Sequence, residues 1–299
     1  ATRKASVDLS KYADVDSLTK LYLINELGKN WDSGVSSLFF TYKQDENGDY
    51  KFYGSPVWDY DNSLGNAGGE QYELSYIGVK DYTEYSGWWC KFKGKDKNSK
   101  SSSNVMNNIS RNKYVTAAAP KIWFEDFMPA INHFSGEKYN SEVEKKLYTS
   151  SEYYNLLKNS AEMNYQSGWL LKTGDWICDH SSMKKASFDL ASKTYTVDSN
   201  TTRYANNFDG MYSYCSDWLT SRAAWLSSQM ASSYTPSYEK GDVNLDGVVD
   251  VTDTTLVQKY LASTAELTSL QIEIADVNGD GTVSVADATA IQKMIAGMR

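Results

Sequence analysis

The end of the chain contains a repeated acidic segment, which limits the folds open to this region more than any other feature. Residues 242–253 read DVNLDGVVDVTD, and residues 276–287 read DVNGDGTVSVAD, at a 34-residue offset. The segments that follow also match, TTLVQKYLA at 254–262 and ATAIQKMIA at 288–296. Apolar residues recur in these segments with helical spacing. The pattern predicts a loop followed by a helix, present twice.

Both loops carry oxygen-bearing residues at the positions that calcium requires. Calcium takes six to eight oxygen ligands, and a twelve-residue loop supplies them from positions 1, 3, 5, 7, 9 and 12. Gly247 and Gly281 stand at position 6, where the chain turns sharply. An acidic turn selected only for turn propensity is the alternative, but agreement at every ligand position favours calcium. The predicted ligands are Asp242, Asn244, Asp246, Val248 (carbonyl), Asp250 and Asp253, and Asp276, Asn278, Asp280, Thr282 (carbonyl), Ser284 and Asp287.

The repeat departs from an ordinary EF-hand in two ways. Position 12 is Asp in both loops, and the sequence predicts no helix before either loop. Val249 and Val283 at position 8 are expected to pair the loops through a short strand contact. Residues 240–299 hold 9 acidic and 4 basic residues, a net charge of −5 that two calcium ions would nearly neutralise. We therefore expect folding of this region to depend on calcium.

A duplicated loop and helix of this kind, over residues 240–299, resembles a type I dockerin. The resemblance implies an all-α module with two bound calcium ions and a cohesin module of a scaffoldin as partner. It further implies a secreted, extracellular, cellulosome-associated protein. The two helices carry equivalent residues, which would let either helix present a similar face to one partner, although a solvated helix face is the alternative. The residues are Thr255, Gln258 and Lys259, and Thr289, Gln292 and Lys293.

A composition change near residue 230 separates this module from a larger region. We predict a domain at residues 1–231, a linker at 232–240 and the dockerin at 241–299. The larger region is expected to be α+β, mostly helical after an N-terminal helix and a hairpin. A helix is predicted at Val15–Leu27, capped by Asp14 or Asp16, and strands at 37–43 and 50–57. Helical patterns then dominate to about residue 229.

An acidic turn follows the predicted hairpin. Asp59 and Asp61 alternate in sequence, and Asp32 lies upstream. Such acids suit metal-assisted phosphoryl transfer, in which one orients or deprotonates the incoming hydroxyl and others hold Mg²⁺ against the phosphates. On spacing alone, a solvated acidic turn would look the same.

Four segments of this region are similar to the CotH family of spore coat protein H-like atypical kinases. They are NELGKNWDSG at 25–34, SLFFTYK at 37–43, PVWDYDNSLGN at 56–66 and WLTSRAAW at 218–225. The resemblance implies a kinase-like fold for this α+β region. It also implies Asp32 as catalytic base, Asp59 and Asp61 as magnesium ligands, ATP as phosphate donor and protein Ser/Thr as acceptor. The family's N-terminal strands and ATP-binding lysine would precede this region. Because Ala1 stands 31 residues before Asp32, we expect that part to be missing here.

Composition narrows the remaining classes. The net charge is −8 and no Lys/Arg-rich run occurs, which argues against nucleic acid and anionic membranes as partners. No apolar run is long enough to span a membrane. Three widely spaced cysteines leave open one disulfide plus one free thiol, with the pair undetermined. The remaining alternative is a carbohydrate-active or non-catalytic binding module for polysaccharide, in which Trp88 and Trp89 would stack on sugar rings or pack in a core.

Overall fold

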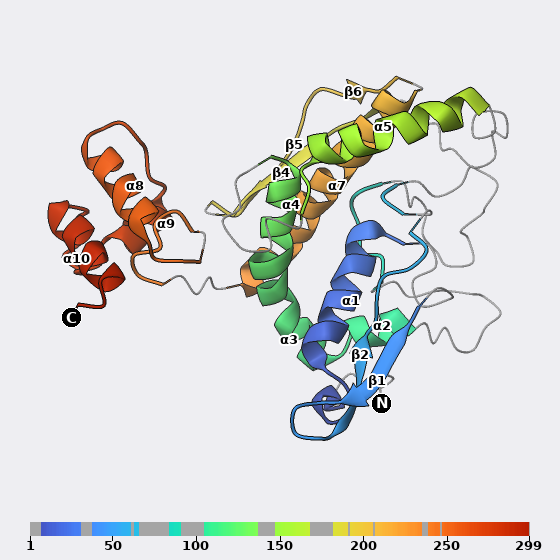
Figure 1. Cartoon of the computed structure of the whole chain (residues 1–299), viewed down its shortest axis with the longest axis horizontal. Helices are drawn as coiled ribbons and strands as arrows, with labels where there is room; N and C mark the ends of the chain where they lie inside the picture. Colours follow the sequence, from blue (N-terminus) through green and yellow to red (C-terminus); the bar gives the residue numbers. More distant parts are fainter. Residues whose placement is uncertain are drawn as a thin grey trace. The chain divides into compact units, whose positions relative to one another are not determined.

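The computed structural model contains two compact units (Figure 1). One comprises residues 1–138, 142–188 and 195–234, and the other comprises residues 139–141, 189–194 and 235–299. The structure describes residues 7–30, 38–60, 63–65, 84–90, 105–136, 147–167, 182–190, 192–205, 207–234, 239–245 and 247–298.

The first long helix, α1, covers Val15–Gly28 and confirms the helix predicted at Val15–Leu27. Of the two candidate caps, Asp14 is the N-cap: its side chain accepts a hydrogen bond from the Ser17 amide at 2.7 Å. The helix ends at Lys29, which has a left-handed backbone with φ 46°. A short 3-10 helix, η1 (Leu9–Lys11), precedes it.

The predicted hairpin is present and is formed by β1 (Phe40–Gln44) and β2 (Tyr50–Gly54). The strands are antiparallel, with Tyr42 opposite Phe52. The Asp45 side chain organises the turn by accepting from the amides of Asn47 and Asp49, both at 2.9 Å. On its other edge β2 exchanges hydrogen bonds with the segment just before α1, which fixes the hairpin to that helix.

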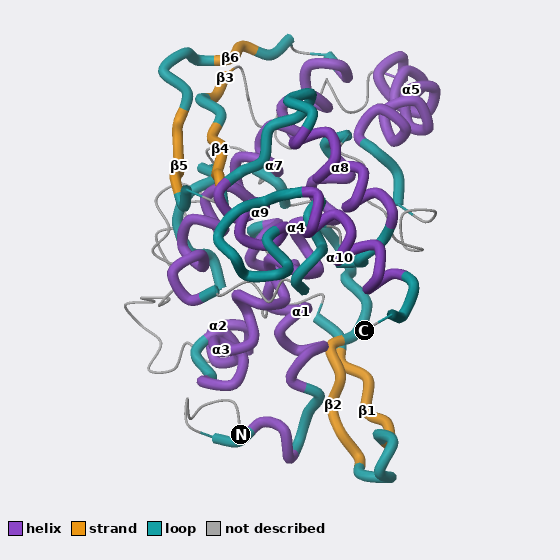
Figure 2. The backbone as a smooth tube through the Cα atoms, turned by 90° about the vertical axis from the view of Figure 1, so that its left-hand side faces the viewer, coloured by secondary structure: helices purple, strands orange, loops and turns teal. Residues whose placement is uncertain are grey.

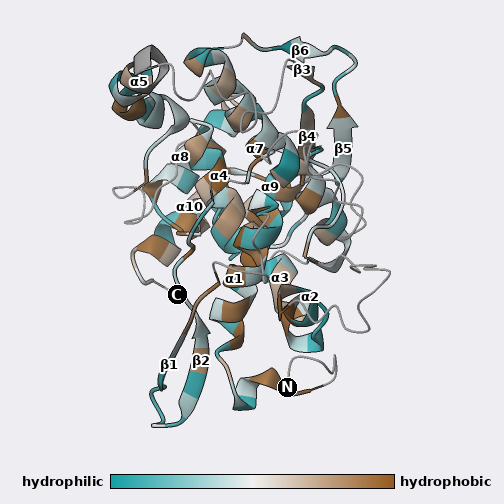
Figure 3. Ribbon diagram, turned by 90° about the vertical axis from the view of Figure 1, so that its right-hand side faces the viewer, coloured by the Kyte–Doolittle hydropathy of each residue, from teal (hydrophilic) through white to brown (hydrophobic). Residues whose placement is uncertain are grey.

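Helices form most of the rest of the first unit. They are α2 (Val105–Ser110), α3 (Lys113–Ile122), a π-helical turn η3 (Trp123–Phe127), α4 (Met128–Phe134), α5 (Ser150–Ser167), α7 (Phe208–Met230) and a 3-10 turn η5 (Ala231–Ser233). α1 contacts α2, α3 and α7, and in Figure 3 α1 and α3 carry hydrophobic residues alternating with hydrophilic ones. Tyr22, Trp123 and Trp218 are among the largest fully buried side chains. The core of this unit therefore lies around α1 and α7.

The expectation of helices up to residue 229 is wrong between residues 182 and 203. Four short strands lie there, namely β3 (Ser182–Met183), β4 (Ala186–Asp189), β5 (Thr194–Val197) and β6 (Thr202–Arg203). β3 pairs with β6, and β4 pairs with β5 (Figure 2). The reason is local: β5 reads TYTV, a β-branched and aromatic run. The turn before it is favoured by Ser192, whose hydroxyl donates to Asp189 at 2.7 Å.

The second unit contains α8 (Val251–Leu261), α9 (Ser269–Ala275) and α10 (Val285–Ile295). α8 and α10 follow the two loops as predicted, and they contact each other. The expectation of no helix before either loop is wrong for the second loop, because α9 ends at Ala275, directly before the loop begins at Asp276. Thr268 and Gln271 form a capping box that starts this helix.

The core of the second unit is small and apolar. It consists of Val243, Val257, Ala275, Ala288 and Ile291. Within the described residues no strand pairing joins the two loops, so the expected strand contact between Val249 and Val283 is not found. Both valines instead pack against this core.

Candidate functional site

The two acidic loops fold in the same way. In the first, the Asp242 carboxylate accepts a hydrogen bond from the Gly247 amide at 3.0 Å. In the second, the Asp276 carboxylate accepts from the Gly281 amide at 2.9 Å. Both glycines are left-handed, with φ of 87° and 86°, a backbone that a Cβ would strain. Position 1 of each loop is therefore tied to the turn at position 6.

The aspartates at position 12 close both loops from the opposite end. Asp253 accepts from the amides of Asn244 at 2.8 Å and Asp250 at 2.9 Å. Asp287 accepts from Asn278 at 3.2 Å and Ser284 at 2.9 Å. Each carboxylate thus receives the amides of positions 3 and 9 of its loop, and it also completes the capping box of the following helix.

Hydrogen bonds within the loops stabilise the ionised form of two further acids, Asp250 and Asp280. The Thr252 side chain and amide donate to Asp250 and lower the pKa of that carboxyl. Thr282 does the same for Asp280. Hydrogen bonds to the ionised form favour it, so both groups are negative at neutral pH. Asp246, predicted at position 5, lies outside the described residues.

The loop residues fit a calcium ion by burial and by donor chemistry. Asp242 is 3% exposed, and Asp253 and Asp287 are 0% exposed. Burying a carboxylate is costly unless hydrogen bonds or a cation compensate it. Among the described residues no three acidic, cysteine or histidine side chains form a metal-binding group. The predicted ligand set, however, also relies on asparagine, serine and carbonyl oxygens, the hard donors that calcium takes.

The helices after the loops expose the residues predicted for partner binding. Thr255, Gln258 and Lys259 are exposed on α8, and Thr289, Gln292 and Lys293 are exposed on α10. The structure adds two residues that the sequence analysis missed. Val251 and Val285, the first residues of these helices, are 64% and 71% exposed. The sequence feature that could have revealed them is that both valines stand at the same position of the repeat, outside the apolar stripe of the helix.

The acids predicted for phosphoryl transfer are described only in part. Asp32 and Asp61 lie outside the described residues. Asp59 is exposed and has a left-handed backbone with φ 62°, in the chain that leaves β2. A non-glycine residue in this conformation is uncommon.

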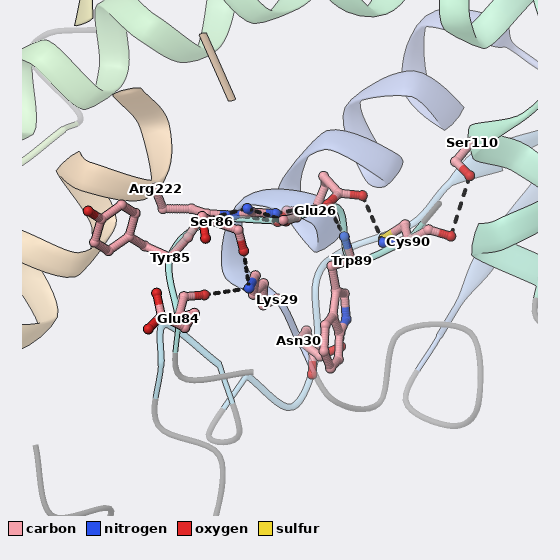
Figure 4. A network of polar contacts seen from close by, with 11 residues as sticks. Glu26, Lys29, Asn30, Glu84, Tyr85, Ser86, Trp89, Cys90, Ser110 and Arg222 are labelled. Carbon is pink, nitrogen blue, oxygen red and sulfur yellow. Dashed lines mark hydrogen bonds and ion pairs between the residues drawn. The ribbon is translucent and has the colours of Figure 1, made fainter. Parts of the chain in front are cut away.

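A buried ion pair joins two of the segments that carried the resemblance to the CotH family. Arg222 on α7 donates to the Glu26 carboxylate on α1 at 2.8 Å, and both side chains are 0% exposed. Figure 4 shows this guanidinium and the backbone of Trp89 and Cys90 converging on Glu26. The amides of Trp89 and Cys90 donate to the two oxygens of that carboxylate. Arg222 also donates to the carbonyls of Tyr85 and Gly87, at 2.8 Å and 2.6 Å.

The same network fixes the end of α1. Lys29 donates through Nζ to the carbonyls of Glu84 and Ser86, and Trp89 donates through its indole to the Asn30 carbonyl at 2.7 Å. Burial lowers the pKa of the Arg222 guanidinium, while the charge of Glu26 opposes that effect. Segment 84–90 is therefore anchored to α7 and to the C-terminal end of α1.

The tryptophans proposed for sugar stacking pack against other side chains. Trp89 is buried, and Trp88 is half-buried and packs edge-on against Trp225 at a ring-centroid distance of 5.4 Å. Core packing, the alternative given for the pair, is confirmed for Trp89. Cys90 is buried and Cys215 is half-buried, and burial raises the pKa of the Cys215 thiol to about 11. Cys178 lies outside the described residues.

Comparison with protein families identifies the class of domain in the second unit. Residues 240–296 match the family model described as dockerin type I domain. These residues form a type I dockerin domain, a calcium-binding module typical of secreted cellulosome components. Searches of curated proteins and of solved structures give no match. Within the described part of the chain, no helix combines the length and apolar character needed to cross a membrane.

Each loop is expected to bind one calcium ion independently of the other. Asp253→Asn keeps the shape of the side chain but replaces one of its two acceptor oxygens with an amino group and removes a buried charge at position 12, so the first site should be lost. Asp287→Asn should remove the second site in the same way. Isothermal titration of the full chain should find two sites in the wild type and one in each variant. Glu266→Gln, an exposed change between the repeats, should keep both. A chain that carries both Asp253→Asn and Asp287→Asn should bind no calcium in these loops. Two remaining sites in that chain would contradict the assignment of the loops as calcium sites.

Removing one partner of the buried ion pair is expected to destabilise the first unit strongly. Arg222→Met leaves the Glu26 charge buried, which should lower the free energy of unfolding by about 3–5 kcal/mol. Urea unfolding followed by tryptophan fluorescence measures this, because all 9 tryptophans precede residue 226. Lys20→Met, which breaks an exposed pair with Asp126, should cost at most about 1 kcal/mol. Equal losses in the two variants would refute the argument.

Proposed function

We propose that this protein is anchored to a scaffoldin through calcium-dependent binding of its dockerin to a cohesin. The observation that carries the proposal is the repeated loop geometry, in which equivalent carboxylates accept from equivalent amides in both loops. Two loops built alike direct two helices that expose equivalent residues. Calcium bound in the two loops would hold α8 and α10 in the arrangement that forms the binding surface. The match of residues 240–296 to dockerins supports a cohesin as the partner of this surface.

The duplication supports two alternative modes of docking. Val251 begins α8 and Val285 begins α10, and each is followed on its helix by an exposed Gln-Lys pair. An exposed apolar residue beside polar side chains is typical of a protein interface. Because the two helices offer the same set, a single cohesin surface would accept either one.

Docking through either helix predicts that both helices must be altered before binding is lost. Gln258→Ala with Lys259→Ala should weaken capture by immobilised type I cohesin modules only a few-fold, as should Gln292→Ala with Lys293→Ala. All four changes together should weaken it about thirty-fold or more, the effect of losing about 2 kcal/mol at an interface hot spot.

The same capture assay also tests the role of calcium. Excess chelator should abolish capture, and Asp242→Ala with Asp276→Ala should do the same, because without metal the loop carboxylates repel one another. Glu266→Gln serves as the control and should leave capture intact. Capture that persists in chelator would overturn the proposed mode of attachment.

We further propose that the first unit transfers phosphate from ATP to protein Ser/Thr, with Asp32 as base and Asp59 and Asp61 on Mg²⁺. The proposal rests on the resemblance of segments 25–34 and 218–225 to the CotH family, and the Glu26–Arg222 ion pair joins one residue from each of these segments. When bound, Mg²⁺ would neutralise charge on the transferred phosphoryl group. The chain's own contribution is to hold the start of the Asp32 segment through the anchored end of α1.

Binding of nucleotide is the direct test of this second activity. A ligand that binds only the folded state raises the unfolding temperature, so Mg²⁺-ATP should stabilise the wild-type chain at fixed calcium. Asp59→Ala should remove this shift, whereas Asp49→Ala, which deletes an exposed acid in the hairpin turn, should keep it. A wild-type chain without a shift would leave a carbohydrate-active or non-catalytic binding module as the role of the first unit.

A further inference from the structure

The hairpin exposes a group of aromatic side chains on one of its faces. Successive residues of a strand point to opposite sides, and residues directly opposite each other share a side. Phe40, Tyr42, Tyr50 and Phe52 therefore lie on the same face, given the pairing of Tyr42 with Phe52 and of Gln44 with Tyr50. We call these four residues the aromatic face. Surface aromatics gathered in this way mark interaction sites more often than isolated ones do.

The rings of the aromatic face are both exposed and ordered. Tyr42 and Tyr50 are 58% and 57% exposed, and Phe52 is 49% exposed. Tyr42 stacks on Tyr50 with centroids 5.2 Å apart, and it lies 4.8 Å from the Phe52 ring. Figures 1 and 2 show the hairpin projecting beyond the helices of the first unit. The contacts between the rings hold a platform in place without covering it.

The two faces of the hairpin differ in charge. The opposite face carries Lys43 and Lys51, with Lys43 over the Tyr53 ring at 4.5 Å and Lys51 paired with Asp45 at 2.7 Å. The side of the hairpin that carries the aromatic face has two further strand positions, which are occupied by Gln44 and Gly54. Neither strand therefore places a charged residue on this side. A neutral ligand with flat apolar surfaces and hydroxyl groups matches this combination, whereas a charged polymer would favour the other face.

We propose that the aromatic face binds a neutral polysaccharide, whose sugar rings stack on Tyr42, Tyr50 and Phe52. Sugar rings present apolar C–H faces to aromatic rings, while the Tyr hydroxyls and the Gln44 amide hydrogen-bond to sugar hydroxyls. The choice of a polysaccharide over another neutral partner rests on the proposed attachment to a scaffoldin, which would bring the hairpin to such polymers. Trp88 and Trp89 are not part of this face, because Trp89 is buried and Trp88 is half-buried against Trp225.

Affinity electrophoresis of the full chain in gels containing hydroxyethyl cellulose or xylan tests this proposal. The wild type should be retarded in at least one polymer. Tyr42→Ala and Tyr50→Ala should each weaken the retardation about tenfold, and Tyr42→Phe, which keeps the ring, should restore most of it. Tyr53→Ala is the matched control, because it deletes a ring of the same kind from the opposite face of the same strand pair.

Several outcomes would overturn the proposal. They are no retardation of the wild type in either polymer, an equal loss in Tyr53→Ala, or a dimer in sedimentation that Tyr42→Ala dissociates, since a second copy would then occupy the face. Cohesin capture measured on the same variants should stay unchanged. Loss of capture in the wild type with retardation intact would refute the attachment and leave polysaccharide binding standing. Should Tyr42→Ala fail to fold, Tyr50→Ala decides, because its ring lies at the exposed start of β2.

Discussion

The first unit depends on one buried ion pair, Glu26 with Arg222. Two charges removed from water are tolerated only when every donor and acceptor is satisfied, and here the carboxylate takes both the guanidinium and two backbone amides. Arg222 in turn binds carbonyls on segment 84–90. The pair therefore fixes three parts of the chain at one point. Hydrophobic burial alone would bring α1 and α7 together, but it would not specify their register or the position of that segment.

In the dockerin, buried carboxylates that accept backbone hydrogen bonds are also predicted to bind calcium, so they are expected to act in ligand binding as well as in the fold. Asp253 and Asp287 close their loops and begin their helices with the same carboxylates that the predicted coordination requires. The small core of five residues offers limited apolar burial. We expect calcium binding and folding to be coupled in such a module, because the metal would compensate carboxylates that a small core cannot stabilise. In the proposed function partner binding would depend on both, since the exposed helix residues follow directly after the loops.

The parts of this structure that follow local rules were predictable from the sequence. The cap of α1 at Asp14, the hairpin turn at Asp45 and the two loop-helix units each depend on residues close in sequence. The helix α9 was missed because it has only 7 residues, in which Leu270, Ile272 and Ile274 alternate with polar residues as they would in a strand. The Glu26–Arg222 pair was out of reach, since no local pattern relates two residues 196 positions apart. The aromatic face needed the strand register, which decides the side to which each ring points.

The distance in sequence between Glu26 and Arg222 has a consequence for synthesis. A chain made from its N-terminus exposes α1 long before α7 leaves the ribosome. Until then neither Glu26 nor segment 84–90 has the Arg222 guanidinium to bind. Contacts between distant residues also require the closure of a long loop, which slows folding. The first unit is therefore built to complete its fold late, after nearly all of its residues have emerged, and the dockerin follows as a separate local event.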